Sequence, residues 1–567
     1  MGNKESFYLT TPIYYVNAVP HLGTAYTSVV TDTMARFMRI TGKDVWFLTG
    51  LDEHGQKIAQ AAEAGGKTPQ EWVDEVAPKF KAAWETLGIT YNDFIRTTEP
   101  RHIRGVQQFF DTLYKEGYIY KDTYKGYYCV PDETFFSDEQ LADFAEIRAS
   151  EELPSKHEDG CPLCPDCCRP LTFVEEENLF FKLSAFEQPL LDYYEANPDF
   201  IQPEIRKNEV LSFVKSGLKD LSVSRTTFDW GVPIPFAPGH VSYVWVDALV
   251  NYITALGYGS DDPVDKERFA RRWPAQVQVV GKDIIRFHCV IWPAMLMAAG
   301  LELPCKVFAH GFLLTKGEKM SKSKGNAMDP LALSKIFSVD GYRYYFLRDV
   351  VFGADGSISL ERMLQVYNAD LANSWGNLCS RALNMTAKYL QGKTPELWEK
   401  TRQALTKEMG NPLAELVEGG LQSRYAAAFS AMDYSGALAV VMELVDAANL
   451  YIEQSAPWSL AKAAAAEEED AAARGIDLLQ AKAPTEGDRL SFVLYNVLES
   501  IRIIALLFAP AMPESSAEVW QRLGLESIHT VDNQAEVSVW GGLSANVDTT
   551  VGKPLFMRLT EDDIAFE

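Results

Sequence analysis

The chain of 567 residues lacks the features that mark membrane and exported proteins. Its longest uncharged apolar stretches, Val290–Leu301 and Ile503–Met512, are shorter than the roughly 20 residues that span a bilayer. The first residues, Met1–Ser6, contain no apolar core of a signal peptide. We therefore expect a cytoplasmic protein that does not enter a membrane.

Basic residues are scarce: 53 Lys and Arg stand against 78 Asp and Glu, which gives a net charge of −25. On the simplest interpretation this argues against nucleic acid as a partner, because binding phosphates requires Lys and Arg. In a long chain, however, only the face that meets the ligand matters, so nucleic acid stays open. The 47% of hydrophobic residues and 23% of charged residues are typical of a folded protein and exclude disorder.

Cysteine is infrequent but unevenly placed. Four of the eight cysteines lie within one short stretch, at Cys161, Cys164, Cys167 and Cys168. In a cytoplasmic protein such clustering indicates metal binding before disulfides.

Two separated parts of the chain alternate between strand and helix patterns. The expected order is strand 7–11 ended by Pro12, helix 24–41 and strand 44–50, then strand 277–280, helix 288–299 and strand 306–309. Short links between such elements are typical of a parallel, doubly wound sheet. The composition between the two parts is richer in aromatic residues, Pro and Cys, and after about residue 365 the pattern becomes helical.

The predicted fold class is therefore α/β. A doubly wound, parallel-sheet nucleotide-binding (Rossmann-like) catalytic domain is split by a small insertion and followed by an α-helical bundle. The predicted segments are the first catalytic half at 1–116, a connective insertion with a zinc-knuckle-like segment at 117–230, the second catalytic half at 231–325, a lysine-loop and stem-contact segment at 326–365, a helical anticodon-binding domain at 366–550 and a tail at 551–567.

A possible phosphate site follows the first predicted strand, in the sequence Pro20-His21-Leu22-Gly23-Thr24. The carboxyl edge of a parallel sheet beside a helix N-terminus is where phosphates bind, because free N–H groups and the helix dipole face the anion. Gly23 allows close backbone approach, and His21 can donate to a phosphate oxygen that gains charge. Taken alone, a histidine in such a loop is more often structural.

A cationic segment, Lys316–Asn326, places four lysines among Gly and Ser residues. It could be an ordinary solvated loop. Glycines flank the lysines, however, and the segment follows a predicted strand in an otherwise acidic chain. Such a segment can close over a polyphosphate and stabilise charge on a leaving group.

Together the two motifs resemble the signatures of class I aminoacyl-tRNA synthetases, with Lys319–Ser323 matching the Lys-Met-Ser-Lys-Ser signature and His21–Thr24 the His-Ile-Gly-His signature. Within the class the chain is most similar to the methionine-specific branch, from Phe7 to about Phe556. The blocks that carry this similarity are Pro12–Asn17, Thr49–Gly55, Tyr243–Ala248, Gly281–Asp283, Phe287–His288, Trp292–Pro293 and Ala456–Trp458. The sequence departs from the signature at Thr24, where a second histidine is usual and where Thr cannot carry charge.

The resemblance implies ATP-dependent ligation of L-methionine to tRNA through a methionyl-adenylate, with Mg²⁺ accompanying ATP. The residues that would stabilise the triphosphate are His21, Thr24, Lys319 and Lys322. Gly23, Gly281 and Asp283 would hold the adenosine, Lys322 would also contact the nucleotide, and the strand near Phe308 would pass the adenine.

For methionine itself, the resemblance places the ammonium on Asp52. The implied side-chain pocket consists of Ile13, Tyr15, Trp245, Leu249, Tyr252 and His288. An aromatic-lined slot suits a polarizable thioether. Without the resemblance, aromatic residues at this spacing would be interpreted as core.

The cysteine-rich stretch resembles the family's zinc knuckle, whose two Cys-x-x-Cys pairs suit tetrahedral zinc. Here Asp132 stands where the second cysteine is common. The expected structural zinc ligands are Cys129, Cys161, Cys164 and Cys167, with Asp132, His157 or Cys168 as replacements for one of them, and a knuckle that has lost its metal is the alternative.

The helical C-terminal part resembles the family's anticodon-binding bundle. Asn377, Arg381 and Trp458 match the positions that contact the anticodon; Arg and Asn can contact base edges and Trp can stack on an unpaired base. Another class I synthetase is an alternative, as is an RNA-binding scaffold without activity. We expect a monomer, and whether a C-terminal module is missing stays open.

Overall fold

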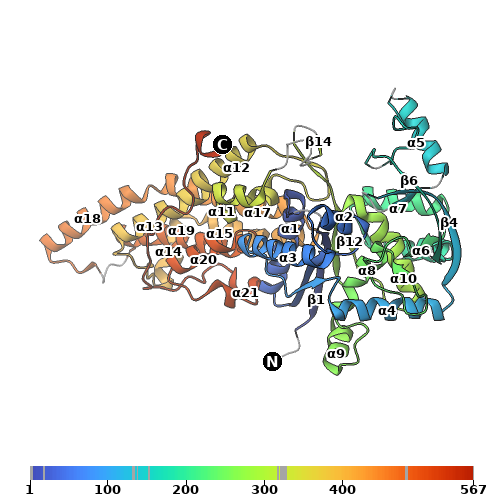
Figure 1. The fold of residues 1–567 in the computed structure, drawn as a ribbon. Helices are drawn as coiled ribbons and strands as arrows, with labels where there is room; N and C mark the ends of the chain where they lie inside the picture. Colours follow the sequence, from blue (N-terminus) through green and yellow to red (C-terminus); the bar gives the residue numbers. More distant parts are fainter. Residues whose placement is uncertain are drawn as a thin grey trace.

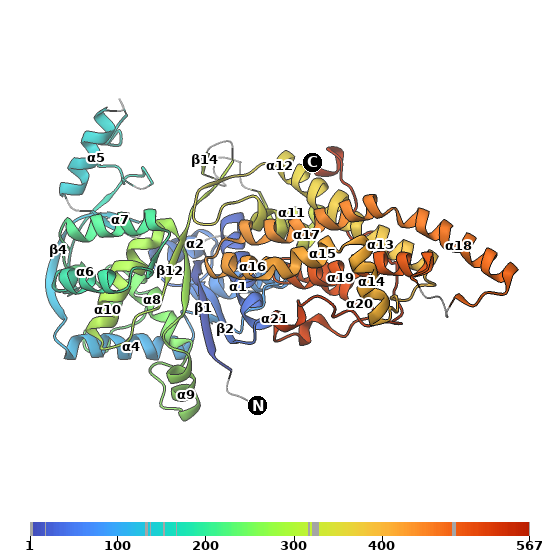
Figure 2. The ribbon, with the colours of Figure 1, turned by 180° about the vertical axis from the view of Figure 1, so that it is seen from behind.

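The computed structural model describes residues 4–16, 19–130, 134–136, 138–150, 153–165, 167–315, 318–319, 328–478 and 483–565. The molecule is elongated, with the central sheet between an insertion at one end and a helical region at the other (Figures 1 and 2). Helix α18 (Pro457–Arg474) projects from the helical end, and α5 (Asp138–Ser150) projects from the insertion (Figure 1).

The central sheet has six strands, and every pair in it is parallel. Its spatial order is β3 (Asp93–Arg96), β2 (Asp44–Asp52), β1 (Ser6–Tyr15), β11 (Val277–Gly281), β12 (Val307–His310) and β7 (Ile201–Gln202). The helices associated with it are α1 (Leu22–Ile40), α2 (Gln56–Ala64), α3 (Pro69–Thr86), α4 (Pro100–Lys115), α8 (Val244–Thr254), α9 (Pro263–Arg272) and α10 (Trp292–Ala298). The predicted doubly wound α/β class is confirmed.

Strand β1 is longer than the sequence predicted. It continues through Pro12 to Tyr15, with a register shift against β2 between Thr10 and Ile13. Proline lacks the N–H of a sheet ladder, but an irregularity in the pairing removes the need for it. The expectation that Pro12 ends the strand was wrong. The longer strand carries two predicted site residues, Ile13 and Tyr15, at its carboxyl end.

The insertion forms a separate antiparallel sheet in the order β5 (Thr134–Phe136), β4 (Ile119–Cys129), β6 (Thr172–Phe181) and β8 (Leu221–Ser222). Helices α6 (Glu187–Ala196) and α7 (Glu204–Lys215) follow β6. Strand β7 belongs to the range 117–230 yet pairs with β12, so this segment also contributes an edge strand to the main sheet. Two short sheets complete the strands: β9 (Ser224–Arg225) with β10 (Val241–Ser242), and β13 (Leu313–Thr315) with β14 (Glu318–Lys319) and β15 (Gly356–Ser357).

From residue 330 onward the structure is mainly helical. Its helices are α11 (Pro330–Arg348), α12 (Leu360–Val366), α13 (Gly376–Tyr389), α14 (Glu399–Met409), α15 (Pro412–Leu416), α16 (Gln422–Ser430), α17 (Tyr434–Ser455), α18, α19 (Glu486–Phe508), α20 (Pro513–Arg522) and α21 (Gln534–Val537). Helix α19 packs against α13, α17, α18 and α20. Two helical stretches, Tyr434–Arg474 and Glu486–Phe508, are long and apolar enough to cross a membrane, but 94% of the apolar window of the second is buried, as in the core helix of a bundle.

A buried ion pair joins α1 of the sheet region to α11 of the helical region. The side chains of Asp32 and Arg343 are both 0% exposed, and their nearest N and O atoms lie 2.7 Å apart. Arg36 also donates to the Asp32 carboxylate, at 2.7 Å. Burial alone would raise the pKa of Asp32, but the two guanidinium groups hold it below its usual range. Arg343 donates further to the carbonyl oxygens of Ala511 (2.9 Å) and Pro510 (3.1 Å), just after α19.

We expect Arg343→Met to destabilise the protein by about 3–5 kcal/mol, because it leaves a buried carboxylate with one cation and two carbonyl groups without their donor. The matched control is Arg362→Met, whose ion pair with Asp349 is 54% exposed on the Arg side chain and should contribute about 0–1 kcal/mol. The thermal midpoint of each variant measures the difference. Equal midpoints for the two variants would contradict this role of Arg343.

Candidate active site

Helix α1 begins at Leu22, at the carboxyl edge of the sheet, and His21 is its N-cap residue. Ring atom Nδ1 of His21 accepts hydrogen bonds from the backbone N–H groups of Gly23 (3.1 Å) and Thr24 (3.3 Å). The hydroxyl of Thr24 accepts from the His21 N–H at 3.1 Å, which completes a capping box. Because Nδ1 accepts, the ring proton of His21 resides on Nε2. The side chain is exposed, so this proton is a donor at a helix N-terminus.

The segment that carries the lysine motif starts beside this helix. At the end of β12, Nε2 of His310 lies 2.8 Å from the hydroxyl of Thr27 in α1, and the His310 ring meets Tyr26 edge-on. Strands β13 and β14 then form an antiparallel hairpin, in which Leu314 pairs with Lys319. The first turns of α1, which follow the histidine motif, therefore contact the end of β12, which leads into the lysine motif. The side chain of Lys319 and the whole of Lys322 lie outside the described residues.

Residues predicted to bind the substrates gather where parallel strands end. Tyr15 and Asp52 are register partners at the ends of β1 and β2, and Gly281 is the last residue of β11. A Cβ atom on Gly281 would lie 2.5 Å from Oδ1 of Asp283, so only glycine allows the Asp283 carboxylate its position. The side chain of Phe308 is buried and stacks on Phe352, and its strand β12 is paired with β11 and β7 at this residue.

The predicted side-chain pocket is built mainly by α8 and a π-helical turn, Phe287–Ile291. Trp245 stacks on Phe287 with ring centroids 3.8 Å apart. The Tyr252 hydroxyl lies 2.7 Å from Nε2 of His288, whose Nδ1 lies 3.0 Å from the carbonyl oxygen of Ile284. Burial lowers the pKa of His288 to about 4. The ring is therefore neutral at pH 7, with Nδ1 donating to Ile284 and Nε2 accepting from Tyr252.

Ile13, Tyr15 and Leu249 belong to the same apolar cluster as this pocket. Leu249 and Tyr252 are fully buried within it, whereas Ile13, Tyr15 and Trp245 stay partly exposed. The structure thus brings together the predicted pocket residues from β1, α8 and the π-helical turn.

Sequence reasoning gave no role to a buried cluster formed by Asp247 of α8 with His54 and His102. Nδ1 of His54 lies 2.6 Å from Oδ2 of Asp247, and Nε2 of His102 lies 2.7 Å from Oδ1 of the same carboxylate. Burial would raise the pKa of Asp247, but His54 and His102 outweigh it and lower the pKa to about 2. The block Thr49–Gly55 was a signal that residues near His54 matter, but their partners lie far away along the chain.

Glu53, next to Asp52, is also buried. It accepts from Nε of Arg96 at 2.6 Å and from the Thr98 hydroxyl. Burial nevertheless raises the pKa of the Glu53 carboxyl. Its partners are side chains of the protein, which separates it from a role toward substrate.

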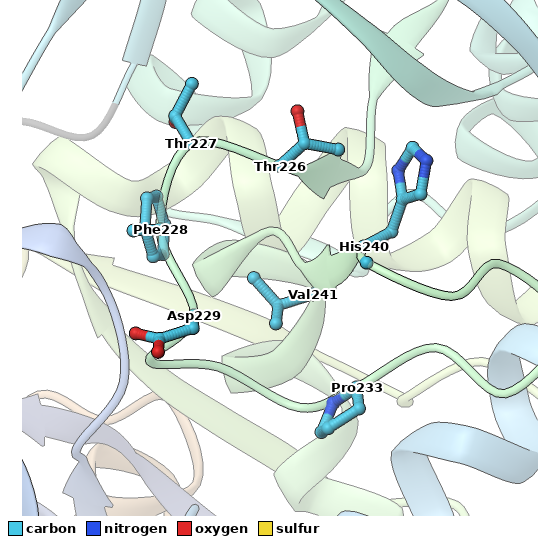
Figure 3. Close-up of a pocket in the computed structure, with 8 residues that line it drawn as sticks. Thr226, Thr227, Phe228, Asp229, Pro233, His240 and Val241 are labelled. Carbon is cyan, nitrogen blue, oxygen red and sulfur yellow. The ribbon is translucent and has the colours of Figure 1, made fainter.

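A hollow of about 510 Å³ is lined by the segment from Thr226 to Val241, which follows β9 and leads into β10 (Figure 3). Its lining residues are Thr226, Thr227, Phe228, Asp229, Pro233, Gly239, His240 and Val241. None of the predicted site residues is among them. Trp230 links this segment to the site, since its indole N–H donates to the Glu53 carbonyl oxygen at 2.6 Å.

Three of the four predicted zinc ligands come together in the insertion. The sulfur atoms of Cys129, Cys164 and Cys167 all lie within 4.8 Å of one another. Cys161 is not in this group, and its thiol donates to the carbonyl oxygen of Leu171. Of the possible replacements, His157 pairs with Asp159 at 3.2 Å, Cys168 is exposed, and Asp132 lies outside the described residues. Three thiolates at this spacing are a donor set that suits zinc.

The predicted anticodon residues lie on two helices that contact each other, α13 and α18. Asn377 is exposed one turn before Arg381 on α13, and Arg381 pairs with Glu453 near the end of α17 at 2.6 Å. Trp458, 43% exposed, follows at the start of α18, and α18 packs against α13.

Known proteins resemble the chain over nearly its full length. Residues 7–383 match the family described as tRNA synthetases class I (M). A methionine–tRNA ligase of Thermotoga maritima is 43% identical over 98% of this chain and 81% of its own length. The corresponding ligase of Streptomyces coelicolor is 44% identical over 99% of this chain and 98% of its own. A solved Mycobacterium tuberculosis methionyl-tRNA synthetase in complex with methionyl-adenylate has a TM-score of 0.84, 41% identity and coverage of 97% and 99% of the two chains.

Proposed function

Because the chain belongs to the methionyl-tRNA synthetases of class I, we propose that it ligates L-methionine to tRNA, with ATP driving the reaction through a methionyl-adenylate. The observation that carries this proposal is the fold shared along nearly the whole chain with a synthetase solved in complex with methionyl-adenylate. The carboxyl edge of the sheet, where α1 begins beside the hairpin of the lysine motif, supplies a site of the right kind.

The proposed reaction has two steps. The methionine carboxylate attacks the α-phosphate of ATP, which Mg²⁺ accompanies, and pyrophosphate leaves. The 3′ end of tRNA then takes the methionyl group, and AMP leaves. Neither step needs a covalent bond to the enzyme, so positioning and electrostatic stabilisation provide the catalysis.

Each group at the sheet edge has a proposed role in the first step. The Nε2 proton of His21 donates to the triphosphate, and the hydroxyl of Thr24 closes the helix cap. Lys319 and Lys322 neutralise the charge that develops on the departing pyrophosphate. Gly23, Gly281 and Asp283 hold the adenosine. Their support is the matched sequence signatures and the meeting of α1 with the β12–β13 segment.

Methionine selection rests on two features of the site. The Asp52 carboxylate receives the ammonium group as a charge-assisted pair. The pocket formed by Ile13, Tyr15, Trp245, Leu249, Tyr252 and His288 receives the thioether, with a neutral His288 ring beside it. Such a pocket distinguishes substrates that differ by one methylene by only about 1–3 kcal/mol, so homocysteine is the most demanding competitor.

The proposal predicts exchange of labelled pyrophosphate into ATP that depends on methionine. We expect exchange with methionine, with weaker exchange for homocysteine, and none with leucine, isoleucine, valine or cysteine. Exchange with another amino acid in place of methionine would indicate a sister synthetase. A folded protein that exchanges nothing but binds tRNA would favour an inactive scaffold.

On the helical side we propose that Asn377, Arg381 and Trp458 contact the anticodon. Trp458→Ala should lower the efficiency of tRNA charging by about 10–100-fold, since stacking on one base contributes about 1–3 kcal/mol. Exchange of pyrophosphate should stay unchanged. The matched control is Trp398→Ala, which removes another exposed tryptophan, 78% exposed, and should change neither assay. Equal loss of both activities in Trp458→Ala would mean that its role is structural.

We also propose that the insertion binds one structural zinc through Cys129, Cys164 and Cys167, with Cys161 turning toward the metal as fourth ligand. Zinc would supply a rigid crosslink within the insertion. We expect about one equivalent of zinc in protein purified without chelator, a tetrahedral four-ligand site being the usual structural arrangement. Cys164→Ser should lose it, whereas Cys168→Ser, at an exposed neighbouring thiol, should keep it. Less than half an equivalent in the unaltered protein would contradict the proposal.

The predicted segment boundaries, the monomeric state and the cytoplasmic location stay predictions.

A further inference from the structure

The proposed methionine site is divided between two elements that are far apart in the sequence. Asp52 ends β2, whereas Trp245, Leu249 and Tyr252 lie on α8. A ligand that places its ammonium on one element and its side chain on the other requires a fixed distance between them. The contacts of the loop after β2 indicate what fixes that distance.

His54 connects the loop to α8. It lies two residues after Asp52, and its Nδ1 is 2.6 Å from Oδ2 of Asp247. Asp247 lies in the first turn of α8, between Trp245 and Leu249. The two partners are 5% and 0% exposed, so water does not compete for this contact.

The opposite oxygen of Asp247 is held as well. His102 of α4 lies 2.7 Å from Oδ1 through Nε2, and its Nδ1 lies 2.8 Å from the hydroxyl of Thr254, at the other end of α8. Helices α4 and α8 are packed so closely here that a Cβ atom on Gly105 would lie 2.2 Å from the Thr254 side chain. Asp247 is thus fixed on both sides.

The rest of the loop is anchored to other elements. The Glu53 carboxylate accepts from Arg96, the Glu53 N–H donates to the Thr97 hydroxyl at 3.0 Å, and the Gly55 N–H donates to the Trp230 carbonyl oxygen at 3.2 Å. These contacts hold the loop toward β3 and the β9–β10 segment. The hydrogen bond from His54 runs in another direction, toward α8, which carries Trp245, Leu249 and Tyr252.

We propose that His54 and Asp247 are positioning residues for methionine: their buried bridge sets the distance between the Asp52 carboxylate and the side-chain pocket on α8. The inference rests on the proposed function and adds to it two residues that do not touch the substrate. Asp247 is itself unsuited to bind the ammonium, because it is 0% exposed and both its oxygens are engaged, whereas Asp52 is 7% exposed.

A purely structural bridge would affect folding without changing which part of methionine is recognised. The experiment therefore compares L-methionine with 4-(methylthio)butanoate, which is methionine without its amino group, by calorimetric titration of the full chain. The ratio of the two affinities reports the contribution of the ammonium group. The thermal midpoint, recorded for every variant, reports stability.

The variants separate the hydrogen bond from the packing. His54→Leu removes the donor, and His54→Asn keeps an N–H near the position of Nδ1. His102→Leu is the matched control, because it removes the other imidazole of the same carboxylate without altering the loop that carries Asp52. Asp247→Asn keeps the volume of the buried side chain and replaces His54→Leu if that variant does not fold.

The unaltered protein should bind methionine more tightly than the amino-free analogue. In His54→Leu and in Asp247→Asn this ratio should fall by about tenfold or more, the range of one hydrogen bond to a charged group, and His54→Asn should restore most of it. His102→Leu should lower the thermal midpoint and leave the ratio within about twofold, since it leaves the His54 contact in place.

If the unaltered protein bound both ligands equally, Asp52 would not be the ammonium ligand and the positioning role of His54 and Asp247 would fall with it. The pyrophosphate exchange assay would still test the proposed function separately. An unchanged ratio in His54→Leu, or equal weakening of both ligands together with a lower midpoint, would overturn the positioning role alone.

Discussion

The ion pair between Asp32 and Arg343 lies where α1, α11 and the end of α19 meet. Helix α1 is buried along most of its length, including the polar residues Thr27, Ser28 and Thr31. It has the sheet on one side, and the helical region provides Phe429, stacked on Phe37, and Tyr434, whose hydroxyl donates to the Val30 carbonyl oxygen. A helix held in this way cannot shift without breaking buried polar contacts. The position of its N-terminus is therefore fixed relative to both the sheet and the helices that carry Arg381 and Trp458.

Carboxylates near the methionine site differ in role because their surroundings differ. Asp247 is surrounded by two imidazole rings, which keep it ionised despite complete burial. Glu53 is held by Arg96 and Thr98, yet burial raises its pKa. Asp52 is the last residue of β2. It is 7% exposed, whereas Glu53 and Asp247 are both 0% exposed. Asp247 and Glu53 are thus held by side chains of neighbouring elements, and Asp52 is the carboxylate proposed to receive the ammonium group.

Features of the fold and of the site could be predicted from the sequence where neighbouring residues determine them, and not where the determining contact lies far away along the chain. The helix over 22–40 was predicted to within a few residues, and the helical pattern expected after about residue 365 is present in helices such as α17 and α19. The extension of β1 beyond Pro12 was not predicted, because the irregular pairing with β2 that permits it depends on the partner strand. The Asp247 bridge could not be found from the sequence, since His54 and His102 are 193 and 145 residues away from Asp247. Similarly, the resemblance to a zinc knuckle implied four thiols, but the sequence could not show that the Cys161 thiol donates to the Leu171 carbonyl oxygen.

The Thr24 position shows how a departure from a signature can be accommodated by backbone chemistry. The first turn of a helix has unsatisfied N–H groups, and an N-cap side chain normally accepts from them. Here the His21 ring does so through Nδ1, so the N–H groups of Gly23 and Thr24 are engaged by the protein. The ring proton of His21 then lies on Nε2, in a single tautomer set by the cap. Thr24 contributes by closing the cap from the other side, with its hydroxyl bonded to both backbone groups of His21. A second imidazole could add positive charge at this position, whereas the threonine contributes its backbone N–H to the His21 ring and its hydroxyl to the His21 backbone.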